Sequence, residues 1–501
     1  MTDISRRGFL AAGTAMLAAQ ALPRIAMARP VPIPLIAGSR VLDIDGRAAT
    51  VWGLAGPLGQ GLSFDPGQRF EVNLRNDLPE PTIIHWHGQI PPNRQDGVPD
   101  MPMPPLNTGE TRSYDYELMP GTYWMHAHIP MHEMRLLAAP LIVRSADDIA
   151  ADRQEAVMFL HDFSFKPPQE VMEEIAGGHD ETAAPQSGTT PQSGMNHAMT
   201  GGMKMDPGMM GQTGMPGMDG MPDMSKMAAM AMDLNDYDWD AYLANDRTLN
   251  DPDVIAVDPG GRVRLRIVNA AAATVFWIDT GALQARLVAV DGHAVQPLSG
   301  NRFGLSMAQR MDLEIDLPAG GGSWPVLALR EGGRERTGIV LATAGAQVAR
   351  LAPLADEAAP AFDTDLAQEG RLIAAAPLAA RATQRQHMVM LGGSMTPYLW
   401  TINGRSWGDH MPLAASSGER VEITFHNMSM MAHPMHLHGH VFQVVGLNGQ
   451  RLSGAMRDTV HVPPMAMVTI AMDAGEAARW MLHCHHMPHL QTGMMTEFAV
   501  T

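Results

Sequence analysis

The chain has 501 residues, which is long enough for two to four domains, and 35 Lys and Arg face 53 Asp and Glu for a formal net charge of −18. This excess of acidic residues argues against nucleic acid and anionic membranes as partners. Methionine is unusually common at 42 residues, and 49 Gly and 38 Pro between short alternating apolar runs predict an all-β chain with many turns.

The N-terminus has the features of an export signal. The twin-arginine pattern Ser5-Arg6-Arg7-Gly8 precedes an apolar run, and Ala26-Met27-Ala28 is an A-x-A cleavage pattern. Residues 1–28 are therefore predicted to be a signal peptide that the twin-arginine export machinery reads. The apolar run is too short for a stable membrane span, and no later stretch is long enough either. We expect a periplasmic monomer without a membrane span.

An internal repeat organises the rest of the chain. Residues 67–76, 260–269 and 418–427 share one alternating apolar pattern that begins at a Gly and ends at an Asn, as a half-buried strand requires. Nine residues after each Asn come His85-Trp86-His87-Gly88, Ile278-Asp279-Thr280-Gly281 and His436-Leu437-His438-Gly439. We expect three copies of one β fold, of which the first and third carry histidines and the second does not.

The repeat sets the predicted domain boundaries. Each copy has the size of a Greek-key β-sandwich. The predicted units are domain 1 at 30–144, domain 2 at 155–344, a linker at 345–384 and domain 3 at 385–501.

Domain 2 is interrupted by an insert at about 166–235. Its core, 195–232, holds 13 methionines among Gly, Pro and Asp, and it lacks the branched aliphatic residues that build a core. We expect a mobile loop. Thioethers are soft ligands that select Cu(I), so the loop is a candidate copper-binding segment, with His197 as a further candidate ligand. The alternative is a methionine-biased insertion without a ligand role.

The only cysteine lies in the stretch His483-Cys484-His485, near the C-terminus. Successive side chains of a strand point to opposite faces, so this stretch can hold one metal group on each face. The Cys484 thiolate, His489 and Met494 supply part of a blue-copper ligand set, and His433 offers the second imidazole.

Three more His-x-His pairs occur, and they are His85/His87, His126/His128 and His436/His438. A single pair is also compatible with two polar residues on a solvated strand face. Four pairs, one of them bracketing the sole cysteine, argue for metal binding.

Together these motifs resemble the four copper signatures of the multicopper oxidases. The methionine-rich insert and the twin-arginine signal are similar to the periplasmic copper-resistance and bacterial laccase branch. The resemblance implies three cupredoxin-like Greek-key β-sandwich domains and four copper ions. By motif position it implies type 1 copper on His433, Cys484, His489 and Met494, type 2 copper on His85 and His436, and a type 3 pair on His87, His126, His128, His438, His483 and His485.

Two carboxylates also match positions that recur in the family. Asp96, in Asp96-Gly97-Val98, implies a carboxylate beside the type 2 copper that delivers protons. The alternative is that Asp96 only forms an Asp-Gly turn. Asp458 is expected to be structural or substrate-orienting. Cys484 is expected to pass electrons to His483 and His485.

The leading functional hypothesis is an oxidase that couples one-electron oxidation of Cu(I), in periplasmic copper detoxification, to the four-electron reduction of dioxygen to water. One departure weakens it, because some cuprous oxidases carry acidic residues where this chain has Ser429 and Leu490. The alternative is a laccase that oxidises phenols or aromatic amines. A copper store without enzymatic activity would explain the methionines but not a complete trinuclear ligand set.

Overall fold

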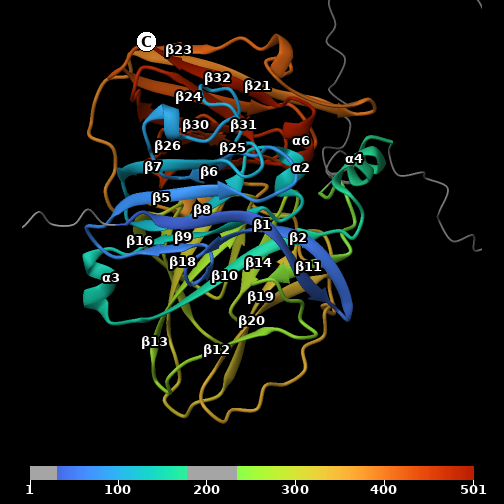
Figure 1. Cartoon of the computed structure of the whole chain (residues 1–501). Helices are drawn as coiled ribbons and strands as arrows, with labels where there is room; N and C mark the ends of the chain where they lie inside the picture. Colours follow the sequence, from blue (N-terminus) through green and yellow to red (C-terminus); the bar gives the residue numbers. More distant parts are fainter. Residues whose placement is uncertain (1–30, 178–233) are drawn as a thin grey trace, which may run out of the picture.

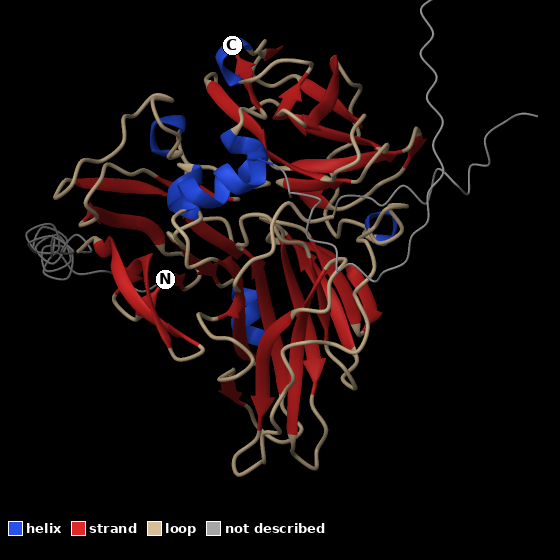
Figure 2. Cartoon of the chain, turned by 90° about the vertical axis from the view of Figure 1, so that its right-hand side faces the viewer, coloured by secondary structure: helices blue, strands red, loops and turns tan. Residues whose placement is uncertain are grey.

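The structure is a computed structural model that describes residues 31–177 and 234–501. The predicted signal peptide and the methionine-rich core of the insert, 195–232, lie outside these ranges. Strands dominate the described residues, and the helices are few and short (Figure 2). Among these residues no helix has the length and apolar character needed to cross a membrane. The predicted all-β class is confirmed.

The strands form three pairs of sheets, each from one continuous part of the chain (Figure 1). The first pair has the orders β3-β2-β1-β5-β7 and β4-β9-β8-β6. Its strands are β1 (Ile33–Ile44), β2 (Arg47–Gly56), β3 (Gly59–Gln60), β4 (Leu62–Phe64), β5 (Arg69–Asn76), β6 (Ile84–His87), β7 (Thr111–Glu117), β8 (Gly121–Ala127) and β9 (Ala138–Val143).

The second pair has the orders β11-β10-β13-β18-β15-β16 and β12-β20-β19-β14-β17. Its strands are β10 (Gln154–Phe163), β11 (Ala241–Ala244), β12 (Asp253–Ala256), β13 (Arg262–Asn269), β14 (Phe276–Asp279), β15 (Ala285–Val290), β16 (His293–Gly300), β17 (Arg302–Leu305), β18 (Arg310–Asp316), β19 (Ser323–Arg330) and β20 (Arg336–Ala342).

The third pair has the orders β22-β21-β24-β30-β26-β27, with β28 beside β26, and β23-β32-β31-β25-β29. Its strands are β21 (Arg385–Met395), β22 (Tyr398–Ile402), β23 (Leu413–Ala415), β24 (Arg420–Asn427), β25 (His433–Leu437), β26 (Phe442–Leu447), β27 (Gln450–Arg451), β28 (Met456–Arg457), β29 (Thr459–Val462), β30 (Met467–Asp473), β31 (Arg479–Cys484) and β32 (Met495–Val500).

Short helices connect the strands. They are α2 (Pro130–Glu133), α3 (Ala146–Ala151), α4 (Pro168–Gly177) and α6 (Met487–Gln491), with 3-10 turns η1 (Asn93–Gln95), η2 (Glu369–Arg371) and η3 (Trp407–Asp409). Helices α2 and α6 pack against each other, so the first and third units are in contact here (Figure 1).

The three repeated segments form β5, β13 and β24, and each strand occupies the same place in its sheet. Each pairs in parallel with the long strand that opens its unit, namely β1, β10 or β21, and antiparallel with a later strand. The second halves of the repeat correspond as well, because β6 pairs with β8, β14 with β19 and β25 with β31. The middle unit therefore keeps the frame in which the other two carry histidines.

The asparagine that ends each repeat is fully buried and makes the same contacts each time. The Asn427 amide donates to the carbonyls of Met431 and Val462, at 2.7 and 3.1 Å, and its Oδ1 accepts from Ser429 N at 2.9 Å. Asn76 and Asn269 bind two carbonyls and one N–H in the same way. These hydrogen bonds satisfy the buried amide group. They also hold the turn between the repeated strand and the next strand, which carries histidines in the first and third copies.

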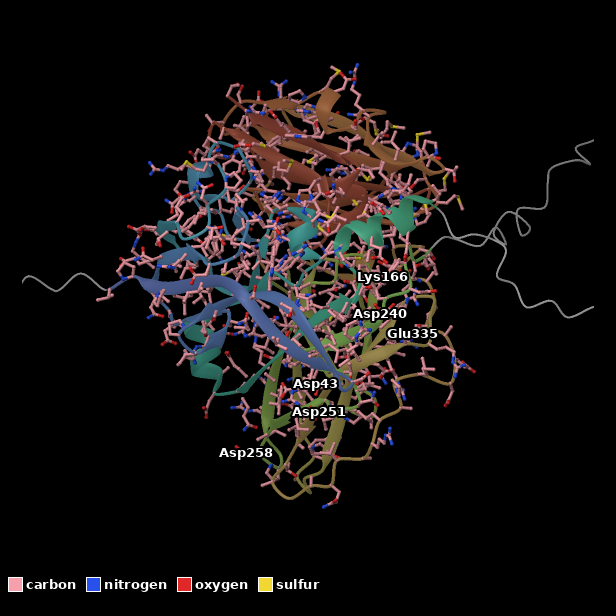
Figure 3. The ribbon with its side chains drawn as sticks, turned by 45° about the vertical axis from the view of Figure 1, so that its right-hand side comes forward. Asp43, Lys166, Asp240, Asp251, Asp258 and Glu335 are labelled. Atoms are coloured by element: carbon pink, nitrogen blue, oxygen red, sulfur yellow. The ribbon has the colours of Figure 1, made fainter. Side chains whose placement is uncertain are left out.

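The start of the predicted insert forms a helix. Residues 168–177 form helix α4, with Val171, Met172 and Ile175 buried on one face, rather than the loop that we expected. These three residues recur at helical spacing after Pro168, which the compositional argument overlooked. The ends of the insert lie together, because Phe165 N donates to Asp240 at 2.8 Å, and Figure 3 labels Lys166 and Asp240 on one side of the molecule.

The predicted linker lies outside the sheets but is anchored by buried side chains. Phe362, Leu366 and Leu372 are at most 3% exposed. The buried Glu369 carboxylate accepts from Arg457 at 3.0 Å, which links the segment to the third unit.

Arg310 joins all three units. Its guanidinium makes a bidentate ion pair with Asp458 of the third unit, with one contact at 2.7 Å, and donates to the Thr122 carbonyl of the first unit at 3.2 Å. Arg310 itself begins β18 of the second unit, and it is fully buried.

Replacing Arg310 by Met should destabilise the protein by about 3–5 kcal/mol, because the Asp458 carboxylate would be buried without its countercharge. Denaturant unfolding of the copper-free protein measures this loss. Arg69→Met is the matched control, since the Arg69–Asp115 pair is exposed and its removal should leave the midpoint unchanged. Equal midpoints for both variants would contradict the role of Arg310.

Candidate metal centre

The sole cysteine lies in a group of three buried donors. Cys484 ends β31, His433 begins β25 and His489 lies in α6, and all three side chains are fully buried. Cys484 Sγ lies 3.7 Å from His433 Nδ1 and 3.6 Å from His489 Nδ1, and the two nitrogens are 3.2 Å apart. The backbone of buried Met494 bonds to Cys484 and His489, both at 3.1 Å, so the thioether residue is adjacent to the group. One thiolate, two imidazoles and a neighbouring thioether fit a blue-copper site.

The other eight predicted ligands converge between the first and third units. His436 Nε2 lies 3.4 Å from His85 Nε2, although 351 residues separate the two in the chain. Strands β6 and β25, which carry these residues, are buried along their whole length. The predicted meeting of the two histidine sets is therefore what the structure shows.

By their shortest nitrogen–nitrogen contacts the eight imidazoles form two groups of three and one pair, and His87 also lies within 4.8 Å of the pair His85 and His436. His438 Nε2 lies 3.1 Å from His128 Nε2 and 3.2 Å from His483 Nε2. His126 Nε2 lies 3.3 Å from His87 Nδ1 and 3.4 Å from His485 Nε2. His85 and His436 form the remaining pair. Two nitrogens that are each about 2 Å from one metal ion lie about 3 Å apart, so these separations fit shared metal ions.

Burial keeps the imidazoles of the two groups of three neutral. It lowers the pKa of His87, His128 and His438 well below the usual 6.5, and neighbouring imidazoles lower it further. The neutral ring is the form that binds a metal ion. Burial also raises the pKa of the Cys484 thiol, so a metal ion must displace its proton on binding.

Asp96 contacts two of the groups at once. Its Oδ2 accepts from His438 Nδ1 at 2.8 Å, and its backbone carbonyl accepts from His85 Nδ1 at 2.7 Å. The next residue, Gly97, has a φ of +92° and leaves no room for a Cβ beside the Ile84 carbonyl. Asp96 is thus both a turn residue and a carboxylate at the cluster, and it lies between the His85 pair and the His438 group rather than beside the pair alone.

Asp458 positions two imidazoles. Its Oδ1 lies 3.0 Å from His87 Nε2, and its carbonyl accepts from His436 Nδ1 at 2.8 Å. Because its carboxylate also pairs with Arg310 and accepts from Thr459 Oγ1, its place in the structure agrees with the structural part of our expectation.

The sequence analysis missed Glu133. This buried residue ends α2, and its Oε2 lies 2.7 Å from His126 Nδ1, with Oε1 3.9 Å from His485 Nδ1. Burial raises the pKa of Glu133 well above its usual value, and a positively charged metal ion at the cluster would lower it. The only signal was an acidic residue five positions after His128, which no spacing rule singled out.

Two residues beside His489 were also missed. Asp236, which comes shortly after the insert, has its Oδ2 3.5 Å from His489 Nε2. The ring of His486 stacks on that of His489, with centroids 3.9 Å apart and an angle of 18°. The sequence motifs did not single out His486.

Comparisons with known proteins agree with this geometry. Three sequence models, each described as multicopper oxidase, match residues 38–148, 187–348 and 380–501. Multicopper oxidase MmcO of Mycobacterium tuberculosis is 29% identical over 98% of this chain and 96% of its own length. Copper resistance protein A of Escherichia coli is 25% identical over 96% of this chain and 94% of its own length. A laccase structure from Botrytis aclada has a TM-score of 0.69 at 18% identity, covering 93% of this chain and 87% of its own, which shows a shared fold.

Replacing Cys484 by Ser should abolish the intense blue absorption and stop substrate-driven dioxygen consumption, because the thiolate group is lost. The eight imidazoles lie in separate groups, so we expect copper content to fall from four ions to three per chain. Visible spectroscopy, metal analysis and oxygen uptake on one sample test this. Retained turnover with a reductant that donates at this group would contradict the assignment.

Proposed function

The chain belongs to the multicopper oxidase family, and we propose that the reductant it oxidises is Cu(I), in the detoxification of periplasmic copper. The enzyme is an oxidoreductase that uses dioxygen as acceptor, and its cofactors are four copper ions: one type 1, one type 2 and a type 3 pair.

We assign the ligands by the geometry of the imidazole groups. The assignment is type 1 copper on His433, Cys484, His489 and Met494, type 2 copper on His85 and His436, one type 3 copper on His87, His126 and His485, and the other on His128, His438 and His483. Support comes from the nitrogen separations of 3.1–3.4 Å within these groups.

Bound copper supplies one-electron storage at the type 1 site and dioxygen reduction at the three-copper cluster. The protein connects the two sites through one strand end, because Cys484 is covalently joined to His483 and His485. His483 and His485 fall in different type 3 groups, so an electron that leaves the thiolate has a short covalent route to each. The buried ligands exclude water from both sites.

Asp96 keeps the ring proton of His438 on Nδ1. By accepting from His438 Nδ1, it fixes the tautomer in which Nε2 faces the His128 and His483 nitrogens. Its Oδ1 lies 3.4 Å from His85 Nδ1, so one carboxylate reaches both the type 2 pair and a type 3 group. We assign Asp96 a role in delivering protons to the cluster.

The observation that most favours Cu(I) is the segment 428–431, the methionine loop, which lies beside the type 1 ligand His433. Ser429 Oγ lies 2.8 Å from His433 Nε2, and its neighbours Met428 and Met430 are 57% and 44% exposed. Soft thioethers on the solvent side of a type 1 ligand suit a cuprous ion and offer nothing specific to a phenol. The relatives named copper resistance protein A and the 13 methionines of the insert core, 195–232, support the same reading. The twin-arginine pattern supports export to the periplasm.

The second candidate is a laccase. Curated relatives named laccase match 88–93% of this chain at 22–24% identity, and the acidic partner of His489, Asp236, suits a substrate that loses a proton with its electron. A copper store alone would not need the eight converging imidazoles.

Replacing Asp96 by Asn should slow reoxidation of the reduced enzyme by about 10- to 100-fold, while type 1 reduction stays within about twofold of wild type. The amide can still accept from His438 but cannot carry a proton. Stopped-flow absorption at the blue band separates the two steps. Asp100→Asn, an exposed change in the same loop, serves as control. Equal slowing of both steps, or no slowing, would leave Asp96 as a turn residue only.

Deleting 195–232 should lower kcat/KM for Cu(I) and leave oxidation of 2,6-dimethoxyphenol equal or higher. Thioethers raise the local concentration of Cu(I) but cannot help a phenol, and a segment without branched aliphatic residues contributes little to the packing of its host. Steady-state rates for both reductants, on fully metallated samples, decide the matter. If Cu(I) kinetics are unchanged over a wide copper range, the laccase reading is preferred.

A further inference from the structure

A small cavity lies between the second and third units, next to the type 1 ligands. Its volume is about 20 Å³, and its lining includes Met307, Met431, Glu331 and His486. All four side chains are at most 4% exposed. A space of this size holds one ion or one water molecule, and it is too small for a phenol ring.

One lining group lacks a partner. His486 is 2% exposed, and its Nδ1 has no hydrogen bond to any residue that the structure describes, whereas its Nε2 lies 3.6 Å from Asp236 Oδ2. Buried ring nitrogens are normally paired, so an unpaired one on a residue that lines a cavity calls for a ligand. The sequence places this histidine directly after the His483-Cys484-His485 stretch, outside the assigned ligand sets.

The chemistry of the lining selects the ligand. Two thioethers and one neutral imidazole are soft or intermediate donors, and they favour Cu(I) over hard cations. Burial raises the pKa of Glu331 to about 7, so near neutral pH this carboxyl group can ionise opposite a bound cation. Simple packing would be served equally well by leucine at 307 and 431, which gives a way to separate the two roles.

We propose that this cavity binds one substrate Cu(I) through Met307, Met431 and His486 before its electron passes to the type 1 site. This inference rests on the proposed cuprous oxidase function. The route is short, because the His486 ring stacks on His489 at 3.9 Å between centroids, and His489 Nδ1 lies 3.6 Å from Cys484 Sγ. One Cu(I) gives one electron and leaves as Cu(II). Four such transfers and four protons reduce one dioxygen to two water molecules.

Binding is tested with Ag(I), which has the charge and ligand preference of Cu(I) but is not oxidised. Crystals of the holoenzyme soaked with Ag(I) should show an anomalous peak at bonding distance from Met307 Sδ, Met431 Sδ and His486 Nδ1. His486→Phe, which keeps a ring to stack on His489, should lose the peak and retain the blue band. Silver bound only at exposed methionines, with the cavity empty, overturns the proposal.

Kinetics test the use of the site. Met307→Leu combined with Met431→Leu should raise KM for Cu(I) at least tenfold, while oxidation of 2,6-dimethoxyphenol changes by no more than twofold. Met388→Leu, at a position 57% exposed on β21, is the matched control and should change neither rate. If wild type oxidises Cu(I) and the double variant keeps its KM, the cavity is not the binding site. If wild type fails to oxidise Cu(I) while silver fills the cavity, the proposed function falls instead, and the cavity is a monovalent-cation site without a role in turnover.

Discussion

The structure depends on burying eight imidazoles from both ends of the chain in one small volume. Burial lowers the pKa of His87, His436 and His485, so these rings pack together as neutral groups that would repel one another if protonated. The cost of burying so many polar rings has to be offset by partners for their nitrogens. The first and third units provide those partners jointly, because each contributes strand-borne histidines to the same interface.

Three carboxylates complete the arrangement around the imidazoles. Asp96 faces His438, Asp458 faces His87 and Glu133 faces His126, each at 2.7–3.0 Å from a ring nitrogen. Each ring therefore has one nitrogen fixed by protein and the other turned toward its group. Asp458 is in turn held by Arg310 of the middle unit, so the unit without ligands helps to orient the cluster. The middle copy of the fold thus contributes to the cluster although its frame carries no histidine at the ligand positions.

The two imidazoles of the cysteine group have different surroundings. His433 presents its outer nitrogen to Ser429 in the methionine loop, and His489 presents its outer nitrogen to Asp236 of the middle unit. The position before His433 that is acidic in some cuprous oxidases is neutral here, while an acidic group from another part of the chain reaches the second imidazole. Ser429 thus replaces an acidic residue beside His433, while the acidic side chain of Asp236 lies beside the other imidazole, His489.

The sequence by itself determined the strand repeat, the all-β class and the residues that converge. Alternating apolar residues specify half-buried strands, and the His-x-His spacing on paired strands fixes which side chains can share a face, so these features are local. Only the tertiary structure decided how eight imidazoles divide into groups, and that Glu133, Asp236 and His486 lie beside the ligands. Their positions depend on how α2, the segment after the insert and α6 pack between units, and contacts across long sequence separations leave no periodic trace in the sequence. Helix α4 was overlooked for a different reason: its apolar spacing was present, but the composition of the longer insert around it concealed the pattern.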